Sequence, residues 1–372
     1  MALTGNKYFN ILGHMRNNPI KNILFVSKSK GLGGGETGLI NLMKAIPVDY
    51  HVKLLLFSKK AFFAYAKNNC INVESVSKMN LLKIIVLFKK NQYIVYNDCF
   101  TLSIYGLLSR LLRKRVIWVA HGQTNSYLKL LPIAMFPHRV ICVSTWVKKY
   151  YNKFRIIDKK LALNGIGIDI NRFRSKAKEI YSNKAKKIIS IIGRFQKVKN
   201  HGAFLRIAQL LLNQSKDKYE FRIIGSNTFE IKEDEIEIKK IINTIKNNPA
   251  LSGKLRFVPF TEDIVPLILE SDFIIQPSLF ESFGLVIIEA MACEKVVLAT
   301  DIGGPKDIIT HEEDGYLISP HYPEKYANVI IELVNDPNKY YGIAKKARKK
   351  IIEKFRSEFI ADKFIRIINT IN

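Results

Sequence analysis

The sequence predicts an α/β protein with two doubly wound, Rossmann-like domains that face each other across a cleft. Short β-branched and aromatic runs alternate with amphipathic helical segments through most of the chain, which is typical of parallel sheets covered by helices on both faces. The 372 residues exceed what one ordinary core holds, and a hydrophobic content of 48% suffices to bury two. Such sheets bind ligands at the carboxyl ends of their strands, so we expect the ligand in the cleft.

The first domain is expected over residues 21–165, after an N-terminal extension of residues 1–20. That extension has a weak apolar stretch without a small-residue cleavage site, which argues against a secretory signal. The predicted strands of this domain are Asn22–Ser27, Val52–Phe57, Tyr93–Tyr96, Val116–Ala120 and Val140–Ser144.

The second domain is expected over residues 166–355. Asn164-Gly165 and the Lys-rich stretch Lys176–Lys187 suggest the boundary between the domains. The strands predicted here lie near Lys187–Ile192, Glu220–Ile224, Lys254–Val258, Asp272–Gln276 and Lys295–Ala299. Two helices, Pro337–Phe355 and Ser357–Ile371, close the chain with apolar residues at helical spacing and Lys and Arg opposite.

Charge is distributed unevenly. Residues 1–165 carry 26 Lys and Arg against five acids, a net charge of +21, whereas the remainder has a net charge of only +6. Acid depletion in one domain suggests an anionic partner there, and nucleic acid, an anionic membrane face and a phosphorylated acceptor all remain open. The four cysteines are scattered, which predicts free thiols in a reducing compartment. No apolar run is long enough to span a membrane.

Two acids eight positions apart are the strongest candidates for a site. Glu281 lies in a polar loop after a predicted strand, and Glu289 lies about two turns into the apolar helix that follows. Free backbone N–H groups at such a helix N-terminus bind anions and hydroxyls. Two carboxylates at this spacing can accept hydrogen bonds from two separate sugar rings, although the same spacing also occurs on ordinary solvated helices.

Two cations follow the first strand of the second domain. Arg194 and Lys199 stand five positions apart between the run Ile188–Ile192 and an apolar helix that begins near Phe204. Arg offers a planar fork and Lys a point charge, so both can converge on the oxygens of a diphosphate. An unrelated surface pair can have the same spacing.

The first domain contributes a glycine-rich loop and a histidine. The loop Gly31–Gly35 follows the first strand, where backbone can approach a phosphate or sugar closely, and a plain tight turn is the alternative. A dinucleotide fingerprint fails because Glu36 occupies the position of its last glycine. His121, followed by Gly122, ends a predicted strand at the carboxyl edge of the sheet, although a lone histidine is more often structural.

Together these motifs resemble those of the retaining glycosyltransferases of the GT-B fold, family 4, or glycosyl transferases group 1. The similar patterns are Glu-x7-Glu with Phe-Gly-Leu inside it, Gly-Arg-x4-Lys-Asn, Gly-Gly-x-Glu and His-Gly. The turn Gly303–Asp307 is similar to a family turn but is more readily structural, and Ser226-Asn227 departs from the usual Gly-x-Gly. The resemblance implies a GT-B fold whose terminal helix, residues 356–372, crosses back to the first domain.

The resemblance also implies roles for the candidate residues. Arg194 and Lys199 would hold the leaving diphosphate, Glu281 the donor sugar and Glu289 the ribose. The implied catalytic residues are His121, Glu281, Arg194 and Lys199. The implied donor-binding residues are Gly34, Gly35, Arg194, Lys199, Glu281, Ser282, Phe283, Gly284, Leu285 and Glu289. The implied reaction moves a hexosyl or N-acetylhexosaminyl unit, with retention, from a nucleotide sugar, most readily a UDP-sugar, to a glycan or lipid-linked acceptor of bacterial polysaccharide or lipopolysaccharide assembly.

Two other function classes stay in view. A nucleotide-sugar epimerase of the same architecture would need further acid and base residues, which the acid-poor first domain does not supply. A nucleic-acid binder would suit the net charge of +27, but no aromatic stacking motif or known binding module accompanies it, so we expect no nucleic-acid partner. No cofactor is expected, and no metal site either, because no Asp-x-Asp stands at a strand-to-loop junction.

Cations beside bulky apolar residues suggest a membrane contact in the first domain. The segments Lys59–Lys67 and Leu107–Arg115 are predicted to be helical, and their basic residues are Lys59, Lys60, Arg113, Lys114 and Arg115. Interfacial helices have this composition, and so do core-packed helices with solvated lysines. We therefore expect a cytoplasmic protein held peripherally at the inner face of the membrane.

Overall fold

The computed structural model describes residues 21–78, 80–124, 127–155, 157–174, 186–225, 232–259 and 261–371. Three predicted features lie wholly or mostly outside these ranges: the N-terminal extension of residues 1–20, the Lys-rich boundary at 176–187 and the departure at Ser226-Asn227.

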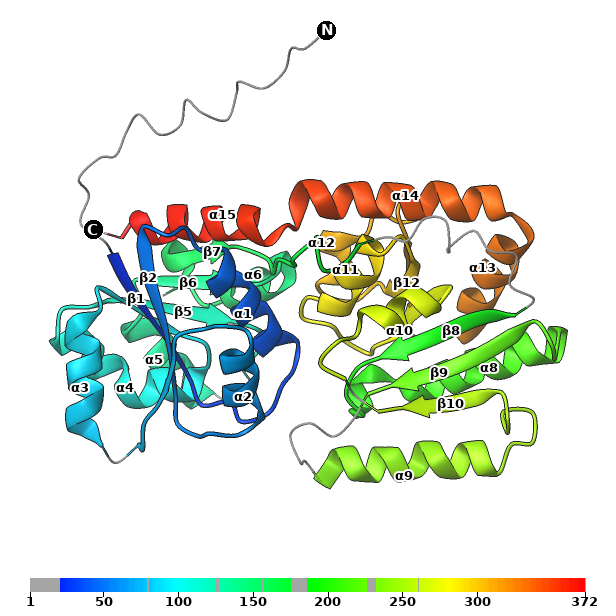
Figure 1. Ribbon diagram of the computed structural model, residues 1–372, viewed down its shortest axis with the longest axis horizontal. Coiled ribbons are helices and arrows are strands. Elements are labelled where there is room, and N and C mark those ends of the chain that lie inside the picture. The colour runs from blue at the N-terminus through cyan, green and yellow to red at the C-terminus, as the bar shows by residue number, and fades with distance from the viewer. Residues whose placement is uncertain are drawn as a thin grey trace, which may run out of the picture.

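The first sheet has seven parallel strands in the order β3-β2-β1-β4-β5-β6-β7 (Figure 1). The strands are β1 (Lys21–Ser27), β2 (Tyr50–Leu56), β3 (Val73–Ser75), β4 (Tyr93–Tyr96), β5 (Arg115–Ala120), β6 (Arg139–Cys142) and β7 (Leu161–Leu163). The helices are α1 (Gly34–Ala45), α2 (Ala61–Asn68), α3 (Leu81–Lys90), α4 (Cys99–Leu111), α5 (Tyr127–Met135), α6 (Thr145–Asn152) and the short η1 (Asp158–Lys160). The strand order reverses between β1 and β4, so a crevice opens at their carboxyl ends.

The second sheet has six parallel strands in the order β10-β9-β8-β11-β12-β13. The strands are β8 (Lys187–Ile192), β9 (Tyr219–Ile224), β10 (Leu255–Val258), β11 (Phe273–Gln276), β12 (Val296–Thr300) and β13 (Tyr316–Ile318). The helices are η2 (Lys197–Lys199), α8 (His201–Gln214), α9 (Lys232–Lys246), α10 (Val265–Glu270), α11 (Leu285–Ala292), α12 (Pro305–Ile308), α13 (Pro323–Asn335), α14 (Pro337–Lys354) and α15 (Ser357–Asn369). The two sheets confirm the predicted fold class.

The predicted strands agree with the structure to within two residues at each end. One difference of two residues is at the end of β6, because Ser144 leaves the strand and caps α6. Its Oγ accepts a hydrogen bond from the Val147 N–H at 3.2 Å, which satisfies one of the free donors of that helix. The short edge strands β3, β7 and β13 were not predicted, since three residues carry too little pattern.

The last helix crosses back to the first sheet, as the resemblance implied. Helix α14 packs against α11, whereas α15 packs against α1 (Figure 1). The crossing point is fixed by two backbone hydrogen bonds, from Ile168 N–H to Phe355 and from Ser357 N–H to Ile168, both 3.0 Å long. A side chain at Gly167 would come within 2.7 Å of Ser357 Cα, so only glycine fits beside the start of α15.

The five cations predicted on membrane-facing helices are placed otherwise. Lys59 and Lys60 precede α2, and Arg113 and Lys114 follow α4. Arg115 begins β5 and lies against the Tyr93 ring. The prediction that they lie on helices is therefore wrong: the turn at Arg113, with a φ of +54°, ends α4 earlier. Lys59 and Lys60 also lie near the carboxyl edge of the sheet, whereas Arg113–Arg115 lie at its amino edge, so the five do not form one face.

No helix in the described ranges is both long and apolar enough to cross a bilayer. The cysteines at positions 70, 99, 142 and 293 are free thiols, as their scatter predicted.

Candidate functional site

Two adjoining cavities lie between the sheets at the carboxyl ends of their strands. The larger, of about 330 Å³, is lined by residues of both halves, including His121, Lys199 and Glu281. The smaller, of about 120 Å³, contains Glu289. Five residues line both cavities: Gly33, Gly34, Arg194, Leu285 and Val286. Arg194 is thus the charged group at the junction of the two.

The loop that carries Glu281 is held by the turn after β12. Glu281 pairs with Gly303 in an isolated bridge, and Gly304 N–H donates to the Glu281 carbonyl at 2.8 Å. Gly303 has a φ of +96°, and a side chain there would meet that carbonyl oxygen at 2.0 Å. The prediction that the Gly303–Asp307 turn has a structural role is confirmed. The turn holds the backbone of Glu281 in place.

The turn that carries Lys199 is bonded directly to the same loop. Leu279 N–H donates to the Val198 carbonyl at 2.8 Å, and the Asn200 amide donates to the Pro277 carbonyl at 3.1 Å. Asn200 adopts a left-handed conformation and caps α8 with its side chain. The two motifs that lie about 80 residues apart in the sequence are therefore one rigid unit.

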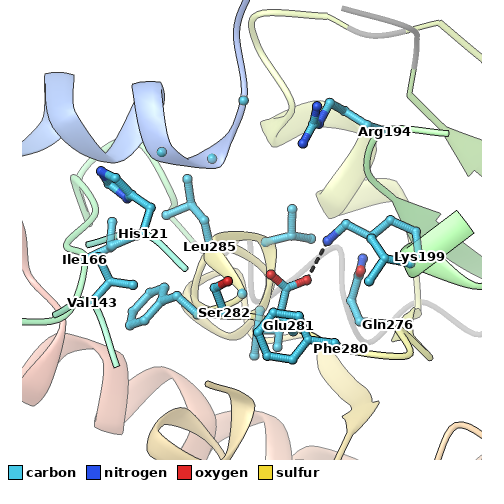
Figure 2. A pocket seen from close by; sticks show the side chains of 18 of the residues that line it. His121, Val143, Ile166, Arg194, Lys199, Gln276, Phe280, Glu281, Ser282 and Leu285 are labelled. Atoms are coloured by element: carbon cyan, nitrogen blue, oxygen red, sulfur yellow. Dashed lines mark hydrogen bonds and ion pairs between the residues drawn. The ribbon is translucent and has the colours of Figure 1, made fainter. Parts of the chain in front are cut away.

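Lys199 and Glu281 form an ion pair on the wall of the larger cavity. Lys199 Nζ lies 2.5 Å from Glu281 Oε2, and about a fifth of each side chain is exposed. Figure 2 shows the pair facing the cavity, with His121 on the opposite side. Arg194 follows β8 on the same side of the cleft as Lys199. Burial lowers the pKa of its guanidinium, but the group stays protonated at neutral pH.

Glu289 is buried in the first two turns of α11. Only 5% of its surface is exposed, and burial raises the pKa of its carboxyl to about 7, while the charge of Arg172 acts in the opposite direction. Helix α11 begins after Gly284, whose φ of +100° sets the turn into the helix. The side chain therefore reaches the smaller cavity from within the core, where a ligand in that cavity can donate hydrogen bonds to it.

The first sheet contributes backbone and one imidazole. Gly34 and Gly35 form the first turn of α1 rather than the predicted loop, so free N–H groups of this helix lie at the cavity. A side chain at Gly35 would meet the His121 ring at 3.5 Å. His121 Nε2 lies 2.7 Å from Asn97 Oδ1, and burial lowers the pKa of His121 to about 4.

Asn97 fixes the histidine tautomer and was not singled out in the sequence. A neutral His121 donates its Nε2 proton to the Asn97 oxygen, which leaves Nδ1 as an acceptor. Asn97 is buried at the end of β4, one strand away from β5. Asn97 could have been identified from its position at the carboxyl end of β4, next to the end of β5 that carries His121. That β4 and β5 are neighbours is known only from the strand order.

The remaining predicted donor residues lie where α11 begins. Ser282, Phe283, Gly284 and Leu285 all line the larger cavity. Phe283 is buried and packs on Phe355, so its ring belongs to the core and only its backbone is available there.

Two further contacts in the cleft escaped sequence reasoning. Gln276 donates to the Ile192 carbonyl and joins the ends of β11 and β8. Across the cleft, the rings of Phe280 and Trp146 lie 4.3 Å apart. Both contacts join segments that are far apart in the sequence and that only the fold brings together.

The position after β9 must be a glycine, Gly225, because the backbone of Gly193 passes very close to it. A side chain there would lie 1.9 Å from the Gly193 carbonyl oxygen, so the backbones after β8 and β9 meet at the floor of the smaller cavity. Within the described ranges, no three His, Cys, Asp or Glu side chains gather as metal ligands do.

Comparisons with known proteins agree with this architecture. Residues 173–350 match the model of the family described as glycosyl transferases group 1. N-acetyl-alpha-D-glucosaminyl L-malate synthase of Bacillus anthracis is 28% identical over 187 residues, which cover 50% of this chain and 46% of the relative. Poly(ribitol-phosphate) alpha-N-acetylglucosaminyltransferase of Staphylococcus aureus is 29% identical over 187 residues, which cover 50% of this chain and 36% of the relative. The chain thus matches less than half of each relative's length.

The fold extends the likeness to nearly the whole chain. The crystal structure of Anabaena HepE in complex with UDP and glucose superposes with a TM-score of 0.83 at 22% identity, and covers 94% of this chain and 99% of that one. At this identity the superposition shows the shared fold. Residues 173–350, slightly less than half of the chain, therefore match the glycosyl transferases group 1 family, and the two-sheet fold is shared over nearly the whole chain.

Proposed function

We propose that the protein is a retaining glycosyltransferase that moves a sugar from a UDP-sugar to a glycan or lipid-linked acceptor. One observation carries the proposal: two adjoining cavities share Arg194, and each has a glutamate in its wall. A nucleotide sugar has the same order of groups, with hydroxyl-rich rings on either side of a diphosphate. The charged groups along the paired cavities, Glu281, Arg194 and Glu289, stand in the same order.

The donor has one orientation that suits the charges. The diphosphate lies at Arg194 and Lys199, beside the free N–H groups that begin α1 and α11. The ribose then meets Glu289 in the smaller cavity, and the transferred sugar meets Glu281 and His121 in the larger one. The bound UDP and glucose of the Anabaena structure support a uridine nucleotide as the donor carrier.

The protonation states favour attack on the same face as the leaving group. An inverting transfer needs a general base opposite the leaving diphosphate. Among the described residues that line the larger cavity, Glu281 is the one carboxylate, and it is engaged in an ion pair with Lys199. His121, with a pKa of about 4, is a poor base at neutral pH. The leaving diphosphate itself then accepts the proton of the acceptor, and catalysis is positioning plus electrostatic stabilisation.

Arg194, Lys199 and two helix N-termini supply the positive charge that a divalent cation would otherwise provide. The proposed reaction is therefore metal-independent. The neutral His121 contacts the donor sugar through a hydrogen bond and carries no charge of its own.

The acceptor side is the basic first half. Its net charge of +21 suits an anionic acceptor, and the Staphylococcus relative is named for a poly(ribitol-phosphate) acceptor, which is itself a polyanion. We place the enzyme in the cytoplasm at the inner face of a bacterial membrane, where it extends a cell-surface polysaccharide or lipopolysaccharide.

The test is release of UDP from a panel of UDP-sugars, with and without lipid-linked or lipopolysaccharide acceptors. Acceptor-dependent release with one donor, and a product whose anomeric configuration by NMR equals that of the donor, is the expected result. Fast acceptor-independent release with a changed sugar configuration would favour the epimerase. Inversion in the product would overturn the retaining assignment, and no reaction with any nucleotide sugar would overturn the function.

A further inference from the structure

Helix α4 exposes a continuous apolar stripe to solvent. Phe100, Ile104, Leu107 and Leu111 are spaced by four, three and four residues, so they lie on one face of the helix. Leu107 is 55% exposed and Leu111 is 72% exposed. The opposite face of α4, with Leu102 and Tyr105, packs into the core, so this stripe is additional to the one that holds the helix on the sheet.

Two neighbouring helices extend the stripe into a surface. Helix α5 packs beside α4, and the rings of Phe88 in α3 and Tyr105 in α4 meet edge to face at 6.3 Å. Figure 1 shows the three helices together at the outer end of the first sheet, away from the second sheet. The outer face of these helices is defined by its exposed apolar residues: Leu81, Leu82, Val86, Phe100, Ile104, Leu107, Leu111, Leu131 and Met135.

This outer face holds most of the exposed apolar groups in the described part of the chain. Nine of the fifteen large apolar side chains that are strongly exposed there belong to it. Leu82 is 79% exposed and Leu131 is 63% exposed. Monomeric proteins rarely leave a contiguous apolar surface of this kind without a partner.

The segment of chain that carries this face is rich in cations. Residues 78–135 contain nine Lys and Arg and one acid, Asp98. The Asp98 carboxylate is occupied within the fold, because it accepts from Lys28 N–H and Thr101 N–H, both at 2.9 Å. Lys28 Nζ lies 4.2 Å above the Phe100 ring, so positive charge and apolar surface touch directly. Of the cations, Lys83 is paired with Glu74.

The composition selects among possible partners. A second copy of the chain would bring cation against cation across a two-fold axis, which disfavours such a dimer. Nucleic acid needs the charge but not nine exposed apolar side chains. An anionic bilayer accepts both, because apolar side chains enter the acyl boundary while Lys and Arg remain among the headgroups.

We infer that the outer face of α3, α4 and α5 binds the surface of an anionic phospholipid bilayer. The face adjoins the site: α4 begins two residues after Asn97, whose side chain contacts His121 in the larger cavity. A bilayer on this face lies against the helices that cover the first sheet, with the Phe100 end of α4 toward the cleft. In this respect the inference rests on the proposed function, since it presents a lipid-linked acceptor directly to the donor.

The experiment is co-sedimentation of the full chain with vesicles of phosphatidylcholine, with and without phosphatidylglycerol. The apolar variant is Leu107→Gln with Leu111→Gln, both at exposed helical positions. The charge variant is Lys89→Gln, Lys90→Gln and Arg113→Gln. Matched controls carry the same changes elsewhere: Ile236→Gln with Phe359→Gln, and Lys345→Gln, Lys346→Gln and Lys349→Gln, all at exposed positions of α9, α14 and α15.

The wild-type chain should bind only vesicles with phosphatidylglycerol, and less as salt increases. Each test variant should lower the partition coefficient by roughly tenfold or more, and the controls by less than about twofold. Equal binding to neutral vesicles, or no binding to anionic ones, overturns the inference. So does an equal loss in the controls, or a wild-type dimer that the apolar variant converts to a monomer.

Calorimetry with UDP separates this result from the proposed function. The face variants should bind UDP as the wild-type chain does, because the outer face lies outside both cavities. Vesicle binding without UDP binding would leave the membrane inference standing and remove the transferase proposal. UDP binding without vesicle binding would do the reverse.

Discussion

The two walls of the cleft are built differently. The wall from the second sheet presents charged side chains on turns that are bonded to one another, as where Leu279 N–H donates to the Val198 carbonyl. The wall from the first sheet presents the glycine backbone that begins α1 and a neutral imidazole held by Asn97. A fixed set of charges suits a donor whose diphosphate is always the same. Under the proposed function, the first wall contacts the donor through backbone N–H groups and the neutral His121 ring.

The first way to test this contrast is to remove a charge from the second wall. Arg194→Ala or Lys199→Ala should raise the barrier to turnover by roughly 2–4 kcal/mol, because the proposed contact strengthens as charge develops on the leaving diphosphate. Steady-state kinetics with the identified donor measure this change. Lys197→Ala is the matched control, since Lys197 is an exposed cation of the same turn. Wild-type turnover in both test variants would remove their assigned role.

The second test concerns the cost of burying Glu289. Its folded pKa of about 7 lies above the ordinary value of 4.5, so the native state binds the extra proton between these pH values. Stability from this group is therefore full below about pH 4.5 and is lost as the pH rises through 7.

Glu289→Gln copies the protonated form and should isolate this effect. The variant and the wild-type chain should be about equally stable near pH 5, and at pH 8 the variant should be more stable by up to about 3 kcal/mol. Urea denaturation at both pH values measures the difference. UDP affinity should fall in the same variant, because the ribose loses a charged acceptor. A stability difference that does not change with pH would contradict the raised pKa.

The third test acts on the first wall. Asn97→Ala should lower kcat by roughly five- to tenfold, about 1 kcal/mol, because His121 loses the hydrogen bond that orients its ring. UDP affinity should not change, because in the proposed orientation His121 contacts the transferred sugar and not the nucleotide. Asn97→Asp retains the accepting oxygen and should recover part of the activity. A merely structural Asn97 would instead reduce thermal stability and UDP binding together.

The smallest expected effect is that of a chelator. If Arg194, Lys199 and the helix N-termini neutralise the diphosphate, excess EDTA should leave the initial rate of transfer unchanged. The control is an equal concentration of the calcium complex of EDTA. Loss of activity that manganese or magnesium restores would show that the second wall needs a cation after all.

Sequence predicted the second wall better than the first for a physical reason. Glu281 and Arg194 stand in local motifs, where a strand end, a loop and a helix start are contiguous and their spacing is visible. Asn97 and His121 come from neighbouring strands that lie 24 residues apart, and only the strand order joins them. The Lys199–Glu281 ion pair likewise depended on two turns meeting in space.

The outer face of α3, α4 and α5 also could not be identified from the sequence alone. Cations beside leucines indicated a membrane contact, but the sequence does not reveal where a helix ends. Because α4 ends at Leu111, the apolar stripe from Phe100 to Leu111 was the stronger signal, and Lys59 and Lys60 belong to another part of the surface. Exposure, which separates a solvent-facing leucine from a core one, becomes known only from the packed structure.

The most direct test of the central claim is a crystal structure of the chain with UDP. The account predicts the ribose hydroxyls within hydrogen-bonding distance of the Glu289 carboxylate, and the diphosphate between Arg194 and Lys199 at the junction of the two cavities. A diphosphate that contacts neither cation, or a uridine in the larger cavity beside His121, would contradict it.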